Sequence, residues 1–224
     1  MPEKIYRHIF WDMGGTMVNT YPEVDSALAQ AVRAAGHPIE IMEVAPLTRR
    51  SIRFAITTLA QRYDLSPDYL RSAEQAVKTR WEKFPAPAMP GVHALAASVA
   101  GKNLVVTHRD RRSACALLEG LRISVDAMVC APDGYARKPD PQMFAVLLEQ
   151  TGADPATCLA IGDRPIDAVA AHAAGIDAAM IFTPGVPLES EADYTVDTLT
   201  ELLPLIAATE SGAGAPEGGA GARE

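Results

Sequence analysis

Residues 9–16 of the chain read Ile-Phe-Trp-Asp-Met-Gly-Gly-Thr, an apolar strand that runs into Asp12 and then into a glycine turn. Burying a carboxylate is costly, so an aspartate at the carboxyl end of a buried strand usually has a chemical role. The two glycines allow a tight turn and a close approach of a ligand to the backbone. An aspartate before two glycines is also ordinary turn chemistry, and this stretch alone leaves a turn and a functional site equally open.

Composition limits the classes of protein to which the chain can belong. It has 224 residues, of which 48% are hydrophobic and 21% charged, enough for one large domain or a domain with an insert. A net charge of −8 and a pI near 5.1 argue against a nucleic-acid partner. No apolar run is long enough to span a bilayer and no secretory signal precedes the first strand, so we expect no membrane partner. Three cysteines without metal-binding spacing suit reduced thiols in a cytoplasmic protein: Cys115, Cys130 and Cys158.

Strands and helices alternate along most of the chain. After a first strand at residues 5–12, strands are predicted at 103–107, 127–131, 158–163, 178–182 and 194–196, with helices at 91–100, 110–119, 141–150, 165–174 and 198–208. Such alternation implies parallel strands with helices on both faces of an open sheet. We therefore predict an α/β fold with a Rossmann-like, doubly wound parallel sheet.

Residues 17–84 interrupt this pattern, because they are helical without any strand. Prolines in first turns and Gly or Pro near the ends indicate three helices, at 22–36, 46–63 and 66–84. Ligands of such sheets bind beyond the carboxyl ends of the strands, so the insert should lie over that site as a lid. The predicted division is a core of residues 1–16 and 89–208, a helical cap of residues 17–88, and a disordered low-complexity tail of residues 209–224.

Four motifs place polar side chains where this geometry would gather them. Asp12 and Thr107 end two strands, Lys138 lies in a loop before a helix, and Asp163 and Asp167 lie at the turn from a strand into a helix. Each has a purely structural alternative, since a threonine can cap a helix, a lysine can be solvated, and an acid is favoured in the first turn of a helix. These alternatives weaken together, because acids, a hydroxyl and a lysine converge on one crevice by independent routes.

The chemistry of these side chains is complementary. Two or three carboxylates with a backbone carbonyl form a hard-oxygen site suited to Mg²⁺. The Thr107 hydroxyl, backbone amides at helix starts and the Lys138 ammonium suit the oxygens of a phosphate. Asp12 can then act as a nucleophile and form an aspartyl-phosphate, with the metal offsetting the repulsion between this carboxylate and an anionic substrate.

In their order along the chain, the motifs resemble those of haloacid dehalogenase-superfamily hydrolases, in the phosphoglycolate-phosphatase-like group with a helical cap after the first motif. That family's pattern is D-x-D-G-T, a hydrophobic strand ending in Ser or Thr, a Lys, and G-D-x-x-x-D. Here it reads Asp12-Met-Gly-Gly-Thr16, Thr107, Lys138 and Gly162-Asp163-Arg-Pro-Ile-Asp167, and the match spans residues 5 to about 208.

The resemblance implies a nucleophile and a metal site. Asp12 would be the nucleophile, and Mg²⁺ would be bound by Asp12, Asp163 and the backbone carbonyl of Gly14. Asp167 would support either the metal or Lys138.

The resemblance also implies how a substrate is held. Thr107 and Lys138, with the neighbouring His108, would bind the substrate phosphate, and Lys138 would in addition take part in catalysis. The implied partner is a small phosphorylated metabolite, and we expect a monomer or a homodimer.

Gly14 departs from the family pattern. Phosphatases of the family carry a second aspartate two residues after the nucleophile, which protonates the leaving oxygen and then activates water. Gly14 keeps the backbone carbonyl but has no proton to give, and general acid–base catalysis contributes roughly 10²–10⁴-fold in rate. We therefore favour a phosphatase that is slow or specialised, or one in which another group supplies the acid, the candidates being His108, Asn19, Arg49, Arg50 and Arg53.

Two alternatives stay open. One is a non-catalytic sensor of phosphorylated metabolites, or an interaction protein, on the same fold. The less favoured one is a relative of the phosphonate-cleaving or dehalogenating branches, which also lack the second acid. A phosphonate-cleaving enzyme needs a cap lysine for a Schiff base, and Lys78 and Lys83 lie near the end of the cap, a poor place for one. Dehalogenases need no metal, whereas Asp163 and Asp167 retain a metal site here, and a phosphomutase would need the missing acid most.

Overall fold

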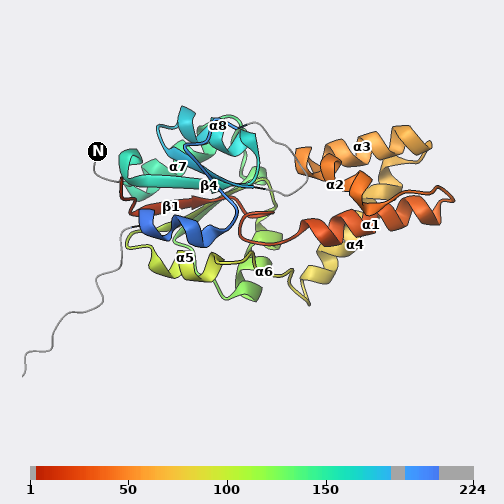
Figure 1. Ribbon diagram of the computed structural model, residues 1–224, viewed down its shortest axis with the longest axis horizontal. Helices are drawn as coiled ribbons and strands as arrows, with labels where there is room; N and C mark the ends of the chain where they lie inside the picture. The colour runs from red at the N-terminus through yellow and green to blue at the C-terminus, as the bar shows by residue number, and fades with distance from the viewer. Residues whose placement is uncertain (1–3, 183–189, 207–224) are drawn as a thin grey trace, which may run out of the picture.

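A six-stranded parallel sheet forms the centre of the computed structural model, which describes residues 4–182 and 190–206 (Figure 1). The strand order is β3-β2-β1-β4-β5-β6, and neighbouring strands pair in parallel throughout. The order reverses between β1 and β4, so the sheet is doubly wound, as the alternation predicted. The strands are β1 (His8–Trp11), β2 (Asn103–Thr107), β3 (Ala127–Cys130), β4 (Cys158–Gly162), β5 (Asp177–Ile181) and β6 (Tyr194–Val196).

Strand β1 is buried on both faces of the sheet. The side chains of Ile9 and Trp11 lie in the hydrophobic core on one face, and that of Phe10 lies in the core on the other face. This two-sided burial explains why residues 9–11 are continuously apolar rather than alternating. Trp11 lies opposite Val105 of β2 and Ile161 of β4, so the three strands end at the same edge of the sheet.

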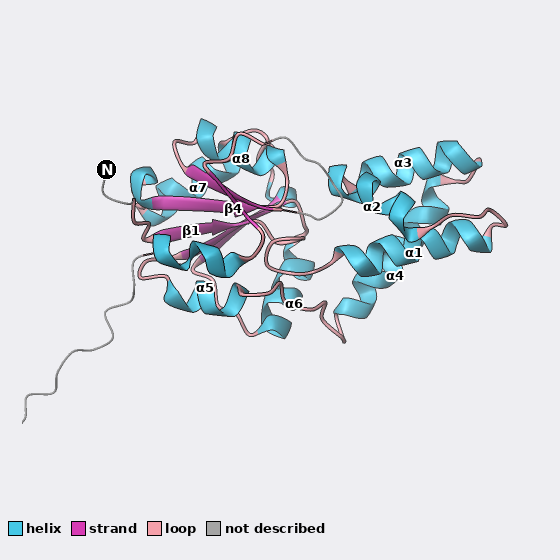
Figure 2. Cartoon of the chain, in the orientation of Figure 1, coloured by secondary structure: helices cyan, strands magenta, loops and turns pink. Residues whose placement is uncertain are grey.

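Helices cover both faces of the sheet, as predicted (Figure 2). One face packs against α5 (Val92–Ser98), α6 (Arg111–Leu121) and the 3₁₀ helix Leu199–Leu205. The other face packs against α7 (Gln142–Thr151) and α8 (Pro165–Ala173). The ends of the helices on both faces therefore frame the edge at which β1, β2 and β4 stop.

A bundle of four helices, which we call the cap helices, lies beyond this edge (Figure 1). They are α1 (Tyr21–Ala34), α2 (Ile41–Arg50), α3 (Ile52–Tyr63) and α4 (Pro67–Trp81). Leu28, Leu59 and Leu70 are fully buried among them. The chain enters and leaves the bundle through two adjacent segments, since the Asn19 amide donates to the carbonyl of Pro87 at 2.8 Å. This crossing lies at the predicted limits of the cap, and the division into domains stays a prediction.

The prediction of one helix at residues 46–63 was wrong, because two helices meet there at Ser51. Helix α2 already begins at Ile41, where the Glu43 carboxylate accepts a hydrogen bond from the backbone N–H of Glu40 at 2.9 Å. Ser51 has an extended backbone, and its hydroxyl accepts from the Phe54 N–H at 3.0 Å, which caps α3. Pro46 therefore lies inside α2 rather than at its first turn.

At the end of the chain, the predicted helix at 198–208 is a 3₁₀ helix over Leu199–Leu205 in the described part. The tail predicted at residues 209–224 lies outside the described residues. Within residues 4–182 and 190–206, no helix has both the length and the apolar character needed to cross a bilayer.

Candidate active site

Asp12, Lys138 and Asp167 form a buried charged cluster at the carboxyl ends of the central strands. Asp12 follows β1, and its backbone N–H donates to the carbonyl of Ile161 in β4 at 2.9 Å. The Lys138 Nζ donates to Asp12 Oδ1 at 2.6 Å and to the Val106 carbonyl at 3.0 Å. It also forms an ion pair with Asp167 Oδ1 at 2.6 Å. All three residues are at most 6% exposed, so the sequence motifs do converge and Lys138 is not a surface lysine.

The charges of this cluster determine which groups are ionised. Burial alone would lower the pKa of Lys138, but the two carboxylates outweigh it and the pKa is raised. Burial would likewise raise the pKa of Asp167, but Lys138 and Arg164 hold it below its usual value. For Asp12 burial prevails over the attraction of Lys138, and its pKa is raised. The ammonium is thus firmly charged and shared between two carboxylates.

Asp163 lies just after β4 and is 1% exposed. Its Oδ2 accepts a hydrogen bond from the Tyr21 hydroxyl at 2.5 Å, whereas its Oδ1 is buried and has no hydrogen-bond partner among the described residues. The nearest cationic atom to Oδ1 is Arg164 Nε at 3.8 Å, too far for a hydrogen bond. Burial, with the charges of Asp12 and Asp167, raises the pKa of Asp163 to about 7.

This unpartnered oxygen tests the fit of the predicted metal. Mg²⁺ prefers hard oxygen donors such as carboxylates. Asp163 Oδ1 is a donor of this kind, and it lies close to a second buried carboxylate, that of Asp12. Among the described residues, no cluster of three or more His, Cys, Asp or Glu side chains is arranged to hold a metal. The predicted Mg²⁺ ligands are two carboxylates, from Asp12 and Asp163, and the backbone carbonyl of Gly14. The residues therefore fit Mg²⁺ as a site with two side-chain ligands.

The second glycine of the motif, Gly15, leaves no room for a side chain. It adopts a positive φ of 87°, and a Cβ there would lie 2.4 Å from Tyr21 Cε2 and 2.5 Å from Asp163 Oδ2. Any side chain would displace the hydrogen bond between Tyr21 and Asp163. Tyr21 was not predicted as a site residue, because an aromatic residue at the start of a helix carries no signal of its contact with a distant aspartate.

Thr107 and His108 lie together at the end of β2. Thr107 is 3% exposed, and its Oγ1 accepts from the Arg109 N–H at 3.2 Å. The cap of α6 is Asp110, which accepts from the Ser113 N–H at 2.9 Å, so Thr107 is not the helix cap. His108 Nε2 is buried and finds no hydrogen-bond partner within residues 4–182 and 190–206. Burial, with nearby cations, lowers the pKa of His108 to about 4. The imidazole is therefore neutral at pH 7.

A cavity of about 450 Å³ opens between the strand ends and the cap helices. Thr107 and His108 lie on its wall beside Asp12 and Gly14. The remaining charged side chains of the wall are mostly cationic: Arg53, Lys78, Arg109, Arg137 and Arg164, against Glu74 and Asp110. The cap thus contributes directly to the site, and the excess of cations favours an anionic ligand.

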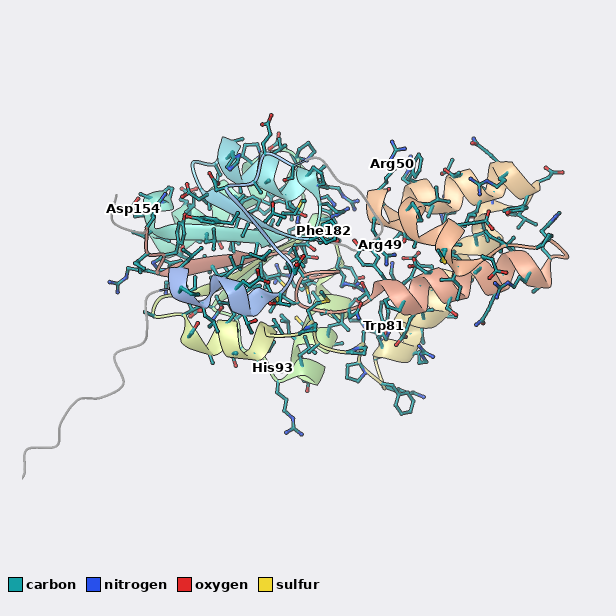
Figure 3. All side chains as sticks on the ribbon, viewed as in Figure 1. Arg49, Arg50, Trp81, His93, Asp154 and Phe182 are labelled. Atoms are coloured by element: carbon teal, nitrogen blue, oxygen red, sulfur yellow. The ribbon has the colours of Figure 1, made fainter. Side chains whose placement is uncertain are left out.

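The cap residues considered as substitute acids are placed very differently. Arg53 lines the main cavity, whereas Asn19 and Arg49 line a second cavity of about 330 Å³. Arg49 pairs with the buried Asp25 and lies 4.0 Å above the Tyr21 ring, between the sheet and the cap helices (Figure 3). Arg50 stacks on Phe54 on the outer side of the bundle.

The expectation that the cap lysines are poorly placed was wrong for Lys78. Helix α4 brings Lys78 to the wall of the main cavity, together with Glu74 one turn earlier. The Lys78 Nζ lies 2.6 Å from Glu74 Oε1. Position along the chain misled here, because the last turns of α4 run back towards the sheet.

Comparisons with known proteins agree with these observations. The family model of the haloacid dehalogenase-like hydrolases matches residues 6–175. The phosphoglycolate phosphatase of Rhodospirillum rubrum is 29% identical over 183 residues, covering 75% of this chain and 76% of that protein. The fructose-1-phosphate phosphatase YqaB of Escherichia coli K12 is 30% identical over 180 residues, covering 77% of this chain and 95% of that protein.

The fold is also shared with solved structures. The crystal structure of a predicted phosphoglycolate phosphatase from Haemophilus somnus 129PT has a TM-score of 0.74 at 18% identity, covering 89% of this chain and 97% of that one. The resemblance drawn from four short motifs is thus confirmed over most of the chain. The protein belongs to the haloacid dehalogenase-like hydrolase family.

Proposed function

We propose that this protein is a Mg²⁺-dependent phosphatase that hydrolyses a small phosphorylated metabolite through an aspartyl-phosphate on Asp12. The observation that carries the proposal is the buried Asp12–Lys138–Asp167 cluster beside a cavity lined by cations. A nucleophilic carboxylate must be oriented and ionised. Lys138 Nζ, 2.6 Å from Asp12 Oδ1, orients this carboxylate and opposes the rise in its pKa that burial causes. Relatives named for phosphoglycolate and fructose-1-phosphate support a phosphorylated acid or sugar as the substrate.

The residues divide the work of the first step. Because Lys138 holds Asp12 Oδ1, we assign Oδ2 as the oxygen that attacks phosphorus. Thr107, His108 and Lys138 would bind the phosphate oxygens. Asp167 lies 2.6 Å from Lys138 Nζ, so we assign it to orienting the lysine rather than to the metal.

Asp12, Asp163 and the Gly14 carbonyl would hold Mg²⁺. When bound, the ion would supply positive charge that offsets the repulsion between the Asp12 carboxylate and the phosphate. Tyr21 keeps Asp163 in place through its hydrogen bond to Oδ2, which leaves Oδ1 for the metal.

The test is a phosphatase assay with and without Mg²⁺. An aryl phosphate reports turnover as such, and a panel of phosphoglycolate and sugar phosphates reports the substrate class. We expect Mg²⁺-dependent release of phosphate that is lost in Asp12→Asn, which keeps the size of the side chain but not its nucleophile. Turnover no greater than that of Asp12→Asn on every substrate would reject the proposal.

Gly14 supports a second candidate, a non-catalytic sensor of phosphorylated metabolites. Without the second acid, the same cavity would bind a phosphorylated ligand and release it unchanged. Calorimetric titration with the substrate panel separates the two functions. Saturable binding without hydrolysis would favour the sensor, and hydrolysis above the Asp12→Asn background would exclude it.

A further inference from the structure

Arg109 lies beside the position at which the family's second acid is missing. A Cβ built on Gly14 would lie 3.3 Å from Thr20 Oγ1 and 3.9 Å from Arg109 Nη2. The carboxylate of an aspartate extends one bond beyond Cβ, so an aspartate at position 14 would be within reach of the guanidinium. The side of the cavity that the acid would occupy is therefore next to a cation.

The guanidinium is held in place from two sides. Its Nη1 donates to Ser113 Oγ at 3.1 Å, and Ser113 lies in the first turn of α6. Its central carbon lies 5.4 Å from the centre of the Trp81 ring, at the end of α4. Trp81 is in turn fixed by a hydrogen bond from its Nε1 to Glu23 at 2.8 Å, which leaves the tryptophan buried at the junction of cap and sheet. Arg109 is thus positioned before any ligand binds.

In the part of the chain that the structure describes, no direct partner neutralises the positive charge of Arg109. Within residues 4–182 and 190–206, no carboxylate oxygen lies within 4.0 Å of its guanidinium nitrogens. Burial lowers its pKa, but an arginine remains protonated in proteins. Arg109 is half-buried, and Asp12, Asp110 and Glu74 act on its charge only from a distance. A cation without a direct anionic partner is unfavourable, and this one lines the main cavity.

We propose that Arg109 is a catalytic residue that donates a hydrogen bond to the leaving-group oxygen, in place of the missing acid. This inference rests on the proposed phosphatase function. In the step, the bond from Asp12 Oδ2 to phosphorus forms while the bond from phosphorus to the ester oxygen breaks. The ester oxygen keeps the electron pair, leaves as an anion paired with the guanidinium, and takes its proton from water. Arg109 keeps its own protons throughout.

This arrangement has a distinct chemical signature. A guanidinium stabilises developing negative charge but transfers no proton, so it helps most where the leaving group is least acidic and bears most charge. The effect belongs to the step that forms the aspartyl-phosphate and is therefore read in kcat/KM. A residue that only bound the phosphate would affect every ester equally.

The first test compares kcat/KM across aryl phosphates whose phenols differ in acidity. In Arg109→Gln we expect a loss that grows as the phenol becomes less acidic, to roughly 10²-fold at the weakest acid. The control is Arg112→Gln, since Arg112 lies only three residues further along the chain, in the first turn of α6, but is 82% exposed and paired with Glu82. Thermal unfolding checks that each variant folds, and Arg109→Met, which also removes the charge, is read for the same trend if Arg109→Gln does not fold.

The second test is a double-mutant cycle with Gly14→Asp. In the wild-type background the new carboxylate pairs with Arg109, and we expect no gain on weakly acidic leaving groups. In the Arg109→Gln background the same substitution should raise kcat/KM, because the acid is then free to donate its proton.

Three outcomes would overturn the inference. A loss in Arg109→Gln that is equal for all phenols would make Arg109 a phosphate-binding residue, and the proposed function would stand. An equal gain from Gly14→Asp in both backgrounds would show that the two side chains do not meet. Wild-type turnover no greater than that of Asp12→Asn would reject the proposed function and this inference together.

Discussion

Replacing Lys138 with methionine should destabilise the protein far more than the loss of one ion pair at the surface. The Lys138 side chain is 1% exposed, and its Nζ lies 2.6 Å from one oxygen each of Asp12 and Asp167. Methionine fills a similar volume but leaves two buried carboxylates without their cation. Breaking a buried ion pair by removing one partner costs roughly 3–5 kcal/mol. For a protein of this size that corresponds to a decrease in Tm of roughly 6–20 °C.

The matched control is Lys4→Met. Lys4 also pairs with an aspartate, Asp177, at 2.5 Å, but its side chain is 45% exposed. Pairs of this kind contribute about 0–1 kcal/mol, so Lys4→Met should change stability by no more than that. The two substitutions have the same chemistry and differ in burial.

The assay is urea unfolding in the presence of a chelator, followed by the fluorescence of Trp11 and Trp81. Equal m-values in the variants and the wild type show that the free energies of unfolding can be compared. Adding Asp167→Asn to Lys138→Met should recover part of the loss, since one buried charge is removed. The deficit should also shrink as the pH falls, because the pKa of an unpaired buried carboxyl is raised and protonation then removes the charge.

A loss in Lys138→Met no larger than that in Lys4→Met would refute this reasoning. It would mean that Asp12 and Asp167 are not ionised in the folded protein, or that water reaches the cluster and replaces the lysine. The assignment of Lys138 as the group that orients the nucleophile would then fail as well.

Three further predictions follow from single residues. Burial raises the pKa of Asp163 from 3.8 to about 7, so its stabilising contribution is full below pH about 4 and is lost as the pH rises through about 7. In urea unfolding without metal, Asp163→Asn should remove this part of the pH dependence, and curves parallel to the wild type would contradict it. Tyr21→Phe removes the hydrogen bond to Asp163 and should lower the free energy of unfolding by about 1–3 kcal/mol, while the Mg²⁺ concentration needed for half-maximal activity rises. Ser51→Ala removes the cap of α3 and should cost about 0.5–2 kcal/mol in the same unfolding assay, with no change in helix α6 or in the Asp12 cluster.

The sheet could be predicted from the sequence because its strands are simple. Each is a short apolar run between turns, and burial on both faces, as at residues 9–11, makes the run continuous. Parallel strands that end at one edge bring Asp12, Thr107 and Asp163 together, so their convergence follows from the topology alone. The roles assigned to these residues remain predictions.

Other features depended on how helices pack and could not be predicted from local pattern. The break at Ser51 separates two helices whose apolar periodicity continues without a glycine, so the pattern was consistent with one helix. Tyr21 reaches Asp163 across 142 positions of sequence, and only the tertiary structure brings them into contact. Lys78 lines the cavity because of the direction of α4, which no residue in the helix indicates.

The position of Arg109 gives a different explanation for the glycine at position 14. From the sequence, glycine at this position is a deficit, since a proton donor worth roughly 10²–10⁴-fold in rate is missing. In the structure the same position faces a fixed guanidinium that pairs with no carboxylate of the described residues, and an aspartate there would neutralise it. The two residues therefore have to be considered as a pair, in which glycine keeps the cation available to the substrate. If glycine at position 14 reflected only the loss of the acid, nothing would require an arginine held against Trp81 and Ser113. The double-mutant cycle of positions 14 and 109 decides whether the acid was simply lost or was replaced by Arg109.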